Sequence, residues 1–106
     1  MSALAVTPPF PTFEISDEAG QLHVAGELDL AAVPELRSRV RAAAASGGTA
    51  VLDLSRVDFI DVAGLSALSA LAHEARREHW RLEVRDASLI VRQLARLCGC
   101  DSRLLN

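Results

Sequence analysis

The sequence predicts one small α/β domain. Its 106 residues match the size of a single ordinary domain, and 50% of them are hydrophobic, which is ample for a core. Two short alternating stretches come first, and runs with a helical period then alternate with short apolar runs. The predicted order is β-β-α-β-α-β-α, so the strands of the second half should run parallel, joined by right-handed crossovers.

A β-hairpin is predicted near the start of the domain. Apolar and polar residues alternate over 12–15 and over 21–25, with a longer loop of turn-forming residues, 17–20, between them. Residues 1–11 contain three of the four prolines and show no period, so they are predicted to form an irregular lead-in. The folded domain is therefore expected to span residues 12–106.

A first helix and a central strand follow the hairpin. The helix stops at the Ser-Gly-Gly of residues 46–48, and Pro34 suits its first turn because no N–H is needed there. Its apolar positions at helical spacing are Val33, Leu36, Val40 and Ala43. Residues 49–54 form a short apolar run without alternation over its middle, which is typical of a strand buried on both faces.

The next two predicted elements are a helix and a strand. Residues 55–61 lead into the helix, residues 76–79 end it, and the alternating residues 81–84 form the strand. The apolar stripe of this second helix consists of Leu65, Leu68, Leu71 or Ala72, and Ala75.

A third helix is predicted to close the domain. Asp86 or Ser88 can cap it, and Gly99 ends it. Its expected inward-facing residues are Ile90, Leu94 and Leu97. For residues 101–106 the sequence leaves both weak docking and fraying open.

Composition argues against several classes of partner. Eleven basic and fourteen acidic residues give a net charge of -3, and the chain has three Phe, one Trp and no Tyr. It therefore lacks both the positive footprint and the stacking platform that nucleic-acid binding needs. No apolar run approaches the roughly 20 residues that cross a bilayer, and no signal peptide is visible. We expect a cytoplasmic protein without direct membrane insertion.

Catalytic residue patterns are missing from the sequence. The histidines at positions 23, 73 and 79 are isolated from any nucleophile, and His73-Glu74 lacks the second histidine of a zinc-protease helix. No glycine-rich phosphate-binding motif occurs. We therefore expect neither an enzyme nor a cofactor.

The cysteines and the aspartates near the second helix are not predicted to bind a metal. Cys98 and Cys100 are expected to be reduced thiols, with a redox-sensing pair as the alternative. Asp53, Asp58 and Asp61 surround one strand-to-helix junction, where they could hold a hard divalent cation, but capping and solubility are the favoured interpretation. No metal is therefore predicted.

The junction before the second helix is the most informative segment. Asp61 can accept backbone N–H bonds at the helix start, and Gly64 allows another backbone or a partner to come close. One helical face, opposite the apolar stripe, should meet solvent or a partner. That face consists of Val62, Ser66, Ser69 and His73.

Two segments of this sequence, GELDL at 26–30 and VLDLSRVDFIDVAGLSAL at 51–68, resemble the STAS domain of bacterial anti-sigma factor antagonists. The resemblance extends over about residues 12–105. It implies a mixed β-sheet with helices packed mainly on one side and no catalytic machinery. It also implies a partner-binding surface around the start of the second helix.

This sequence departs from the family pattern at one position. In regulated members of the family, the residue after the motif Asp is a Ser or Thr that the anti-sigma factor, a kinase, phosphorylates. Here Asp61 is followed by Val62, which has no hydroxyl to phosphorylate. Ser66, one turn further on, is a candidate surrogate phosphosite, but an ordinary exposed helix residue is the favoured interpretation.

The leading hypothesis is therefore a module that docks constitutively on an anti-sigma factor of the histidine-kinase-like ATPase type and so regulates sigma factor availability. The expected partner-binding residues are Asp29, Asp58, Asp61, Val62, Gly64, Leu65, Ser66 and Ser69. One alternative is a cytoplasmic accessory subunit of a membrane transport complex, and another is a small-ligand sensor. An apolar surface around Val62 and Leu65 could also support a weak homodimer.

Overall fold

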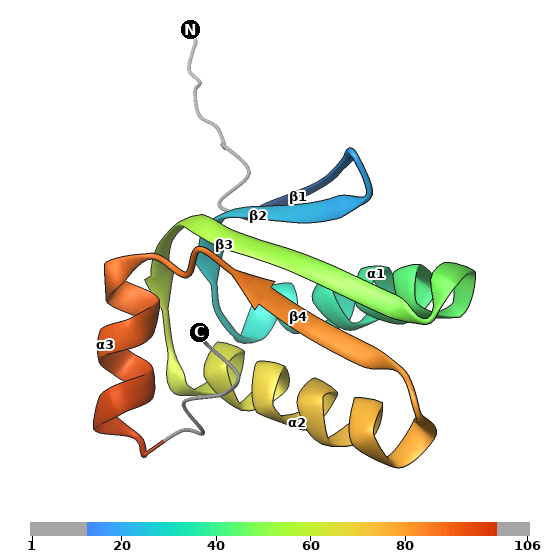
Figure 1. Cartoon of the computed structure of the whole chain (residues 1–106). Coiled ribbons are helices and arrows are strands. Elements are labelled where there is room, and N and C mark those ends of the chain that lie inside the picture. The colour runs from blue at the N-terminus through green and yellow to red at the C-terminus, as the bar shows by residue number, and fades with distance from the viewer. Residues whose placement is uncertain (1–12, 100–106) are drawn as a thin grey trace, which may run out of the picture.

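The computed structural model describes residues 13–99 and consists of a four-stranded sheet with three α-helices and a short 3-10 helix (Figure 1). The elements are β1 (Phe13–Glu18), β2 (Gln21–Leu28), η1 (Leu30–Ala32), α1 (Val33–Gly47), β3 (Thr49–Ile60), α2 (Val62–Glu78), β4 (Arg81–Arg85) and α3 (Leu89–Leu97). This order confirms the predicted β-β-α-β-α-β-α succession. The predicted lead-in 1–11 and residues 101–106 lie outside the described residues.

The sheet is mixed, with the strand order β1-β2-β3-β4. β1 pairs antiparallel with β2, whereas β2 with β3 and β3 with β4 are parallel pairs. The crossover helices α1 and α2 lie on the same side of the sheet (Figure 1). The predicted fold class, an α/β domain with helices mainly on one side of a mixed sheet, is confirmed.

The hairpin turn is tighter than predicted. β1 continues to Glu18 and β2 begins at Gln21, so only Ala19 and Gly20 connect them. Both residues have positive φ angles, 54° and 79°, as in the two-residue turns that match the twist of a hairpin. The expected longer loop over 17–20 is therefore wrong.

β3 alternates in burial instead of being covered on both faces. Leu52 and Leu54 are fully buried beneath the helices, while Val51 and Asp53 on the opposite face are half-buried. Within residues 13–99 no helix covers that face (Figure 1), so it can carry polar side chains such as His23, whose Nδ1 lies 3.5 Å from Oδ2 of Asp53. β3 also continues to Ile60, through a segment that the sequence predicted as a lead-in to the helix.

The first two helices bury their apolar stripes largely as predicted. In α1 the buried residues are Val33, Leu36, Val40 and Ala44, so Ala44 takes the place expected for Ala43. In α2 they include Leu65, Leu68, Leu71 and Ala75. None of the helices in the described part of the chain is long and apolar enough to span a membrane.

The third helix faces the core with different residues from those predicted. Val91 and Ala95 are buried, whereas Ile90 is exposed and Leu97 is 84% exposed. The Ser88 hydroxyl donates a 2.7 Å hydrogen bond to the Val57 carbonyl and so ties the start of α3 to β3. We attribute the inward orientation of the smaller side chains to this close attachment. The expected inward positions of Ile90 and Leu97 are wrong.

Candidate functional site

Two aspartates follow adjacent parallel strands at one edge of the sheet. Leu28 and Ile60 are register partners at the ends of β2 and β3, and the next residues are Asp29 and Asp61. Asp29 accepts a 3.3 Å hydrogen bond from the N–H of Ala32, at the start of η1. Both carboxylates are therefore used as helix caps at this edge.

Asp61 is the N-cap of α2, as predicted. Its backbone is extended, with φ -110°, and its Oδ1 accepts a 2.8 Å hydrogen bond from the N–H of Gly64. The N–H of Asp61 itself donates to the Leu28 carbonyl at 3.4 Å. A negative charge is favourable at this end of a helix because the unpaired N–H groups there are partly positive.

Gly64 provides close contact with the protein's own backbone. It is buried, and a Cβ built on it would overlap the carbonyl oxygen of Leu28. Of the two expected roles for this glycine, the structure shows the backbone approach. The first turn of α2 therefore rests directly on the end of β2.

The exposed face of α2 begins immediately after the cap. Val62 is 59% exposed, and Ser66 and His73 are also exposed, while Ser69 is half-buried. Leu65 is only 4% exposed because it belongs to the core stripe. The expectation that Leu65 contributes to an exposed apolar surface is therefore wrong.

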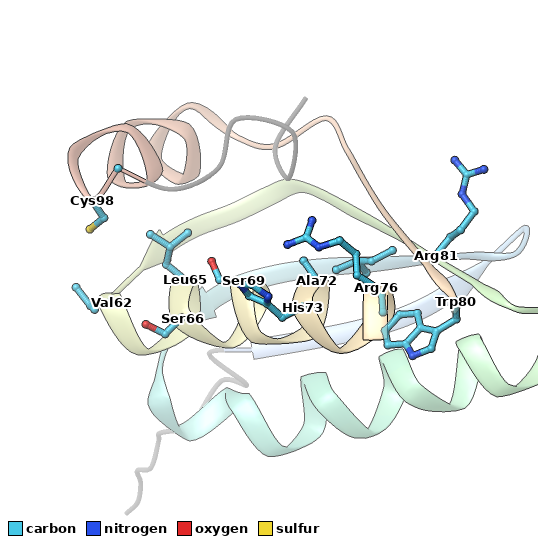
Figure 2. Close-up of a pocket in the computed structure, with 13 residues that line it drawn as sticks. Val62, Leu65, Ser66, Ser69, Ala72, His73, Arg76, Trp80, Arg81 and Cys98 are labelled. Atoms are coloured by element: carbon cyan, nitrogen blue, oxygen red, sulfur yellow. The ribbon is translucent and has the colours of Figure 1, made fainter. Parts of the chain in front are cut away.

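A shallow groove of about 750 Å³ runs along this face (Figure 2). Val62, Ser66, Ser69 and His73 line one wall from α2, with Arg76 further along the helix. Leu65, Ala72 and Ala75 of α2 also line the groove. The remaining lining residues come from two later segments, namely Trp80, Arg81 and Leu82 at the start of β4, and Cys98 and Gly99 after α3. Figure 2 shows Cys98 near Val62, so the end of α3 lies beside the start of α2.

Sequence reasoning did not find the contributions of Trp80, Arg81 and Cys98 to this groove. The helical spacing of α2 identifies its own face but not which later segments pack beside it. Cys98 is a free, exposed thiol. Cys100, the other member of the possible redox pair, lies outside the described residues.

The three junction aspartates have separate environments. Asp53 lies on the open face of the sheet, where its carboxylate accepts hydrogen bonds of 2.6 and 2.8 Å from the hydroxyl and N–H of Ser55. Partial burial raises the pKa of Asp53, but these two hydrogen bonds and nearby His23 outweigh it, so the pKa lies below its usual value. Asp58 is exposed on β3, and residues 13–99 contain no group of three or more possible ligands that could hold a metal ion.

The fold and the capped junction define a STAS-type domain. The sequence model of the STAS_2 family, described as "Mlab, STAS domain", matches residues 12–106. The chain belongs to this family. A comparison with curated proteins gave no match.

Solved structures with a similar fold include anti-sigma factor antagonists. The antagonist SpoIIAA in its unphosphorylated form has a TM-score of 0.63 at 22% identity, with 86% of this chain and 84% of that chain covered. An anti-sigma factor antagonist from Mycobacterium paratuberculosis gives 0.61 at 28% identity, covering 83% and 77%. The Bacillus cell fate determinant SpoIIAA in the phosphorylated form gives 0.60 at 21%, covering 86% of each chain.

Proposed function

We propose that this protein is an anti-sigma factor antagonist that binds a histidine-kinase-like anti-sigma factor in the cytoplasm and thereby regulates the availability of a sigma factor. Its docking surface centres on the start of α2. The similarity to an antagonist at 28% identity supports the class of function. The single observation that carries the proposed surface is the exposed position of Val62, directly after the Asp61 cap.

The architecture of the junction suits a preformed docking surface. Asp61 and Gly64 hold the first turn of α2 against β2. The backbone of Val62, which lies between them, therefore has little conformational freedom. An apolar side chain held outward at a rigid site can contact a partner without a large ordering cost. Ser66, one turn further along α2, and Asp58, near the end of β3, are also exposed and are included in the proposed surface.

Docking is proposed to be constitutive. Val62 occupies the position at which the regulated members of the family have a Ser or Thr, and neither Val62 nor Ala63 has a hydroxyl. A phosphate would add about -1.5 to -2 charges at this point and would disturb an apolar contact. Without an acceptor, the kinase activity of the partner has no direct means of releasing this protein.

A transport role is the second candidate, and the same missing hydroxyl favours it. An accessory subunit of a membrane transport complex has no need for a phosphorylation switch at the start of α2. The exposed Val62 would then contact an ATP-binding transport subunit. The two candidates share the docking surface and differ in the class of partner.

Affinity purification from the native host tests the proposal. The tagged protein and a Val62→Asp variant would be compared, with mass spectrometry identifying partners and modified serines. We expect the unmodified chain, but not the variant, to capture a kinase-like anti-sigma factor, with no phosphate on Ser66 or Ser69. Recovery of transport subunits instead would overturn the proposal in favour of the second candidate.

A further inference from the structure

Exposed apolar side chains gather at one end of the molecule. The large hydrophobic residues of the described chain that remain exposed are Leu30, Phe59, Val62, Leu89, Ile90 and Leu97. They belong to η1, the end of β3, the start of α2 and α3, which lie together at the same end of the fold (Figure 1). Proteins that remain monomeric rarely leave such a patch uncovered, so it indicates a binding surface.

The patch divides into two halves of opposite charge. We call the first half the acidic edge, which consists of Asp29, Leu30, Asp58, Phe59, Asp61 and Val62. The second half is the α3 face, which consists of Leu89, Ile90, Arg92, Arg96 and Leu97. α3 contains no acidic residue, so its exposed side is apolar and positively charged.

The charges of the two halves lack ion-pair partners in residues 13–99. Neither Arg92 nor Arg96 forms a salt bridge with the described residues, and neither does Asp58. All three side chains are exposed. Each half thus offers apolar contact area together with unpaired charges of the sign that the other half attracts.

We propose that two copies of this chain associate through this end, the α3 face of each packing against the acidic edge of the other. A two-fold axis between the copies would produce both contacts at once, because the elements that carry the two halves lie at the same end of the fold (Figure 1). Such a patch is complementary to itself. Cys98, at the end of α3, and Val62 line the same groove, so the end of α3 lies beside the start of α2.

Self-association has a consequence for partner binding, which rests on the proposed function. Val62 belongs to the acidic edge and also to the proposed docking surface for the anti-sigma factor. A dimer of this geometry covers Val62, so self-association and docking exclude each other. At high concentration the free protein would then be mainly dimeric, and the dimers would dissociate to supply monomer for docking.

The test is the molar mass of the purified protein in the absence of any partner, so its outcome is independent of the proposed function. Light scattering after gel filtration would follow the chain from micromolar to millimolar concentration. The mass should rise from 11.3 kDa towards twice that value, and added salt should reduce the rise because it screens the charges.

Charge-reversal variants test whether the α3 face of one copy contacts the acidic edge of the other. The Arg92→Glu/Arg96→Glu variant makes the α3 face acidic, and Asp58→Lys makes the acidic edge more basic without removing a helix cap. Each variant alone should dimerise at least about tenfold more weakly, because the new glutamates face the acidic edge in the first variant and the new lysine faces Arg92 and Arg96 in the second. Mixed in equal amounts, the two variants should form a heterodimer more readily than either dimerises alone. Arg92 and Arg96 of the second variant then face the intact acidic edge of the first, and the new lysine faces the two new glutamates.

The matched control carries Arg37→Glu/Arg77→Glu, the same change of net charge at exposed positions of α1 and α2. It should dimerise like the unmodified chain. Recovery of the heterodimer also demonstrates that both variants are folded. An unmodified chain that stays at 11.3 kDa throughout the concentration range would overturn the proposal, as would a mixture that remains monomeric.

Discussion

The carboxylate of Asp61 accepts a 2.8 Å hydrogen bond from the backbone N–H of Gly64, three residues further along α2. Gly64 in turn lies so close to Leu28 that no Cβ fits between them. The first turn of α2 is therefore held both from its own cap and from the neighbouring strand. Val62 lies between these two attachments, and its side chain is left exposed.

Removal of the cap should destabilise the protein moderately. In Asp61→Ala, the N–H of Gly64 loses its acceptor, and the expected loss of unfolding free energy is about 1 kcal/mol. Asp61→Asn retains an acceptor oxygen and should lose less. Urea unfolding of the three proteins would measure the difference, and equal midpoints for all three would show that the hydrogen bond contributes nothing.

A methyl group at position 64 should be far more damaging. Gly64→Ala places a Cβ against the Leu28 carbonyl, and the required backbone shift should cost about 3 kcal/mol. Gly47→Ala is the matched control, because Gly47 is a helical residue with nothing within 4 Å of the point that an added Cβ would occupy. It should stabilise α1 by about 0.5–1 kcal/mol. Thermal unfolding that ranked the two variants in the opposite order would contradict this packing.

The ion pair between α1 and α2 predicts a pH-dependent contribution to stability. Arg41 donates hydrogen bonds of 2.9 and 2.7 Å to the two carboxylate oxygens of Glu74. These bonds lower the pKa of Glu74. Glu74→Gln should therefore lower the unfolding free energy at neutral pH, by a small amount because the pair is partly exposed to solvent.

Acid should remove that difference. A carboxylate whose pKa is lowered by folding stabilises the protein above its ordinary pKa of about 4.3, and the contribution disappears as the pH falls through the folded-state value. Urea midpoints of the unmodified chain and Glu74→Gln should therefore converge on acidification. Glu14→Gln, at an exposed position of β1, is the control, because Glu14 forms no ion pair with the described residues, and it should unfold like the unmodified chain at both neutral and acidic pH. A gap between Glu74→Gln and the unmodified chain that persisted in acid would contradict the ion pair as its cause.

Much of the fold follows from local sequence patterns. The alternation in the hairpin and the leucine spacing of α2 predicted those elements because each reflects one buried face. The extension of β3 to Ile60 did not follow, since the polar residues at 55, 56 and 58 resemble a turn. The pairing of β2 with β3 contains two register shifts there, and such irregularities depend on the partner strand.

The orientation of α3 shows the limit of periodicity most clearly. Ile90, Leu94 and Leu97 form the more apolar stripe, so hydrophobicity alone favours them as the inner face. Val91 and Ala95 are the buried residues instead, while Leu94 is half-buried against the core and Ile90 and Leu97 are exposed. We attribute this orientation to the Ser88 hydrogen bond, which holds the start of the helix close to β3. At the site, the cap at Asp61 was predictable from local chemistry, whereas the position of Cys98 beside Val62 required the tertiary fold.

A hydroxyl introduced at position 62 should make docking sensitive to phosphorylation. In Val62→Ser, the anti-sigma kinase is expected to transfer phosphate from ATP to the new side chain, and binding should weaken once the phosphate is attached. Intact-mass spectrometry and a binding assay, each with and without ATP, would follow both steps. The unmodified chain, treated in parallel, should gain no phosphate and should bind equally well in both conditions.

A serine variant that stays unmodified while bound to the kinase would contradict this expectation. The start of α2 would then not be presented to the active site of the partner. Phosphate on Ser66 of the unmodified chain would also contradict constitutive docking, because a displaced switch would be present one turn further along the helix.

The most direct test of the docking surface is a binding titration of the purified partner with Val62→Asp. A charge at this exposed apolar position should weaken docking at least about tenfold, or ~1.4 kcal/mol. Ala42→Asp, at an exposed position of α1, introduces the same charge elsewhere and should bind like the unmodified chain. If Val62→Asp binds as tightly as Ala42→Asp, the start of α2 is not the docking surface.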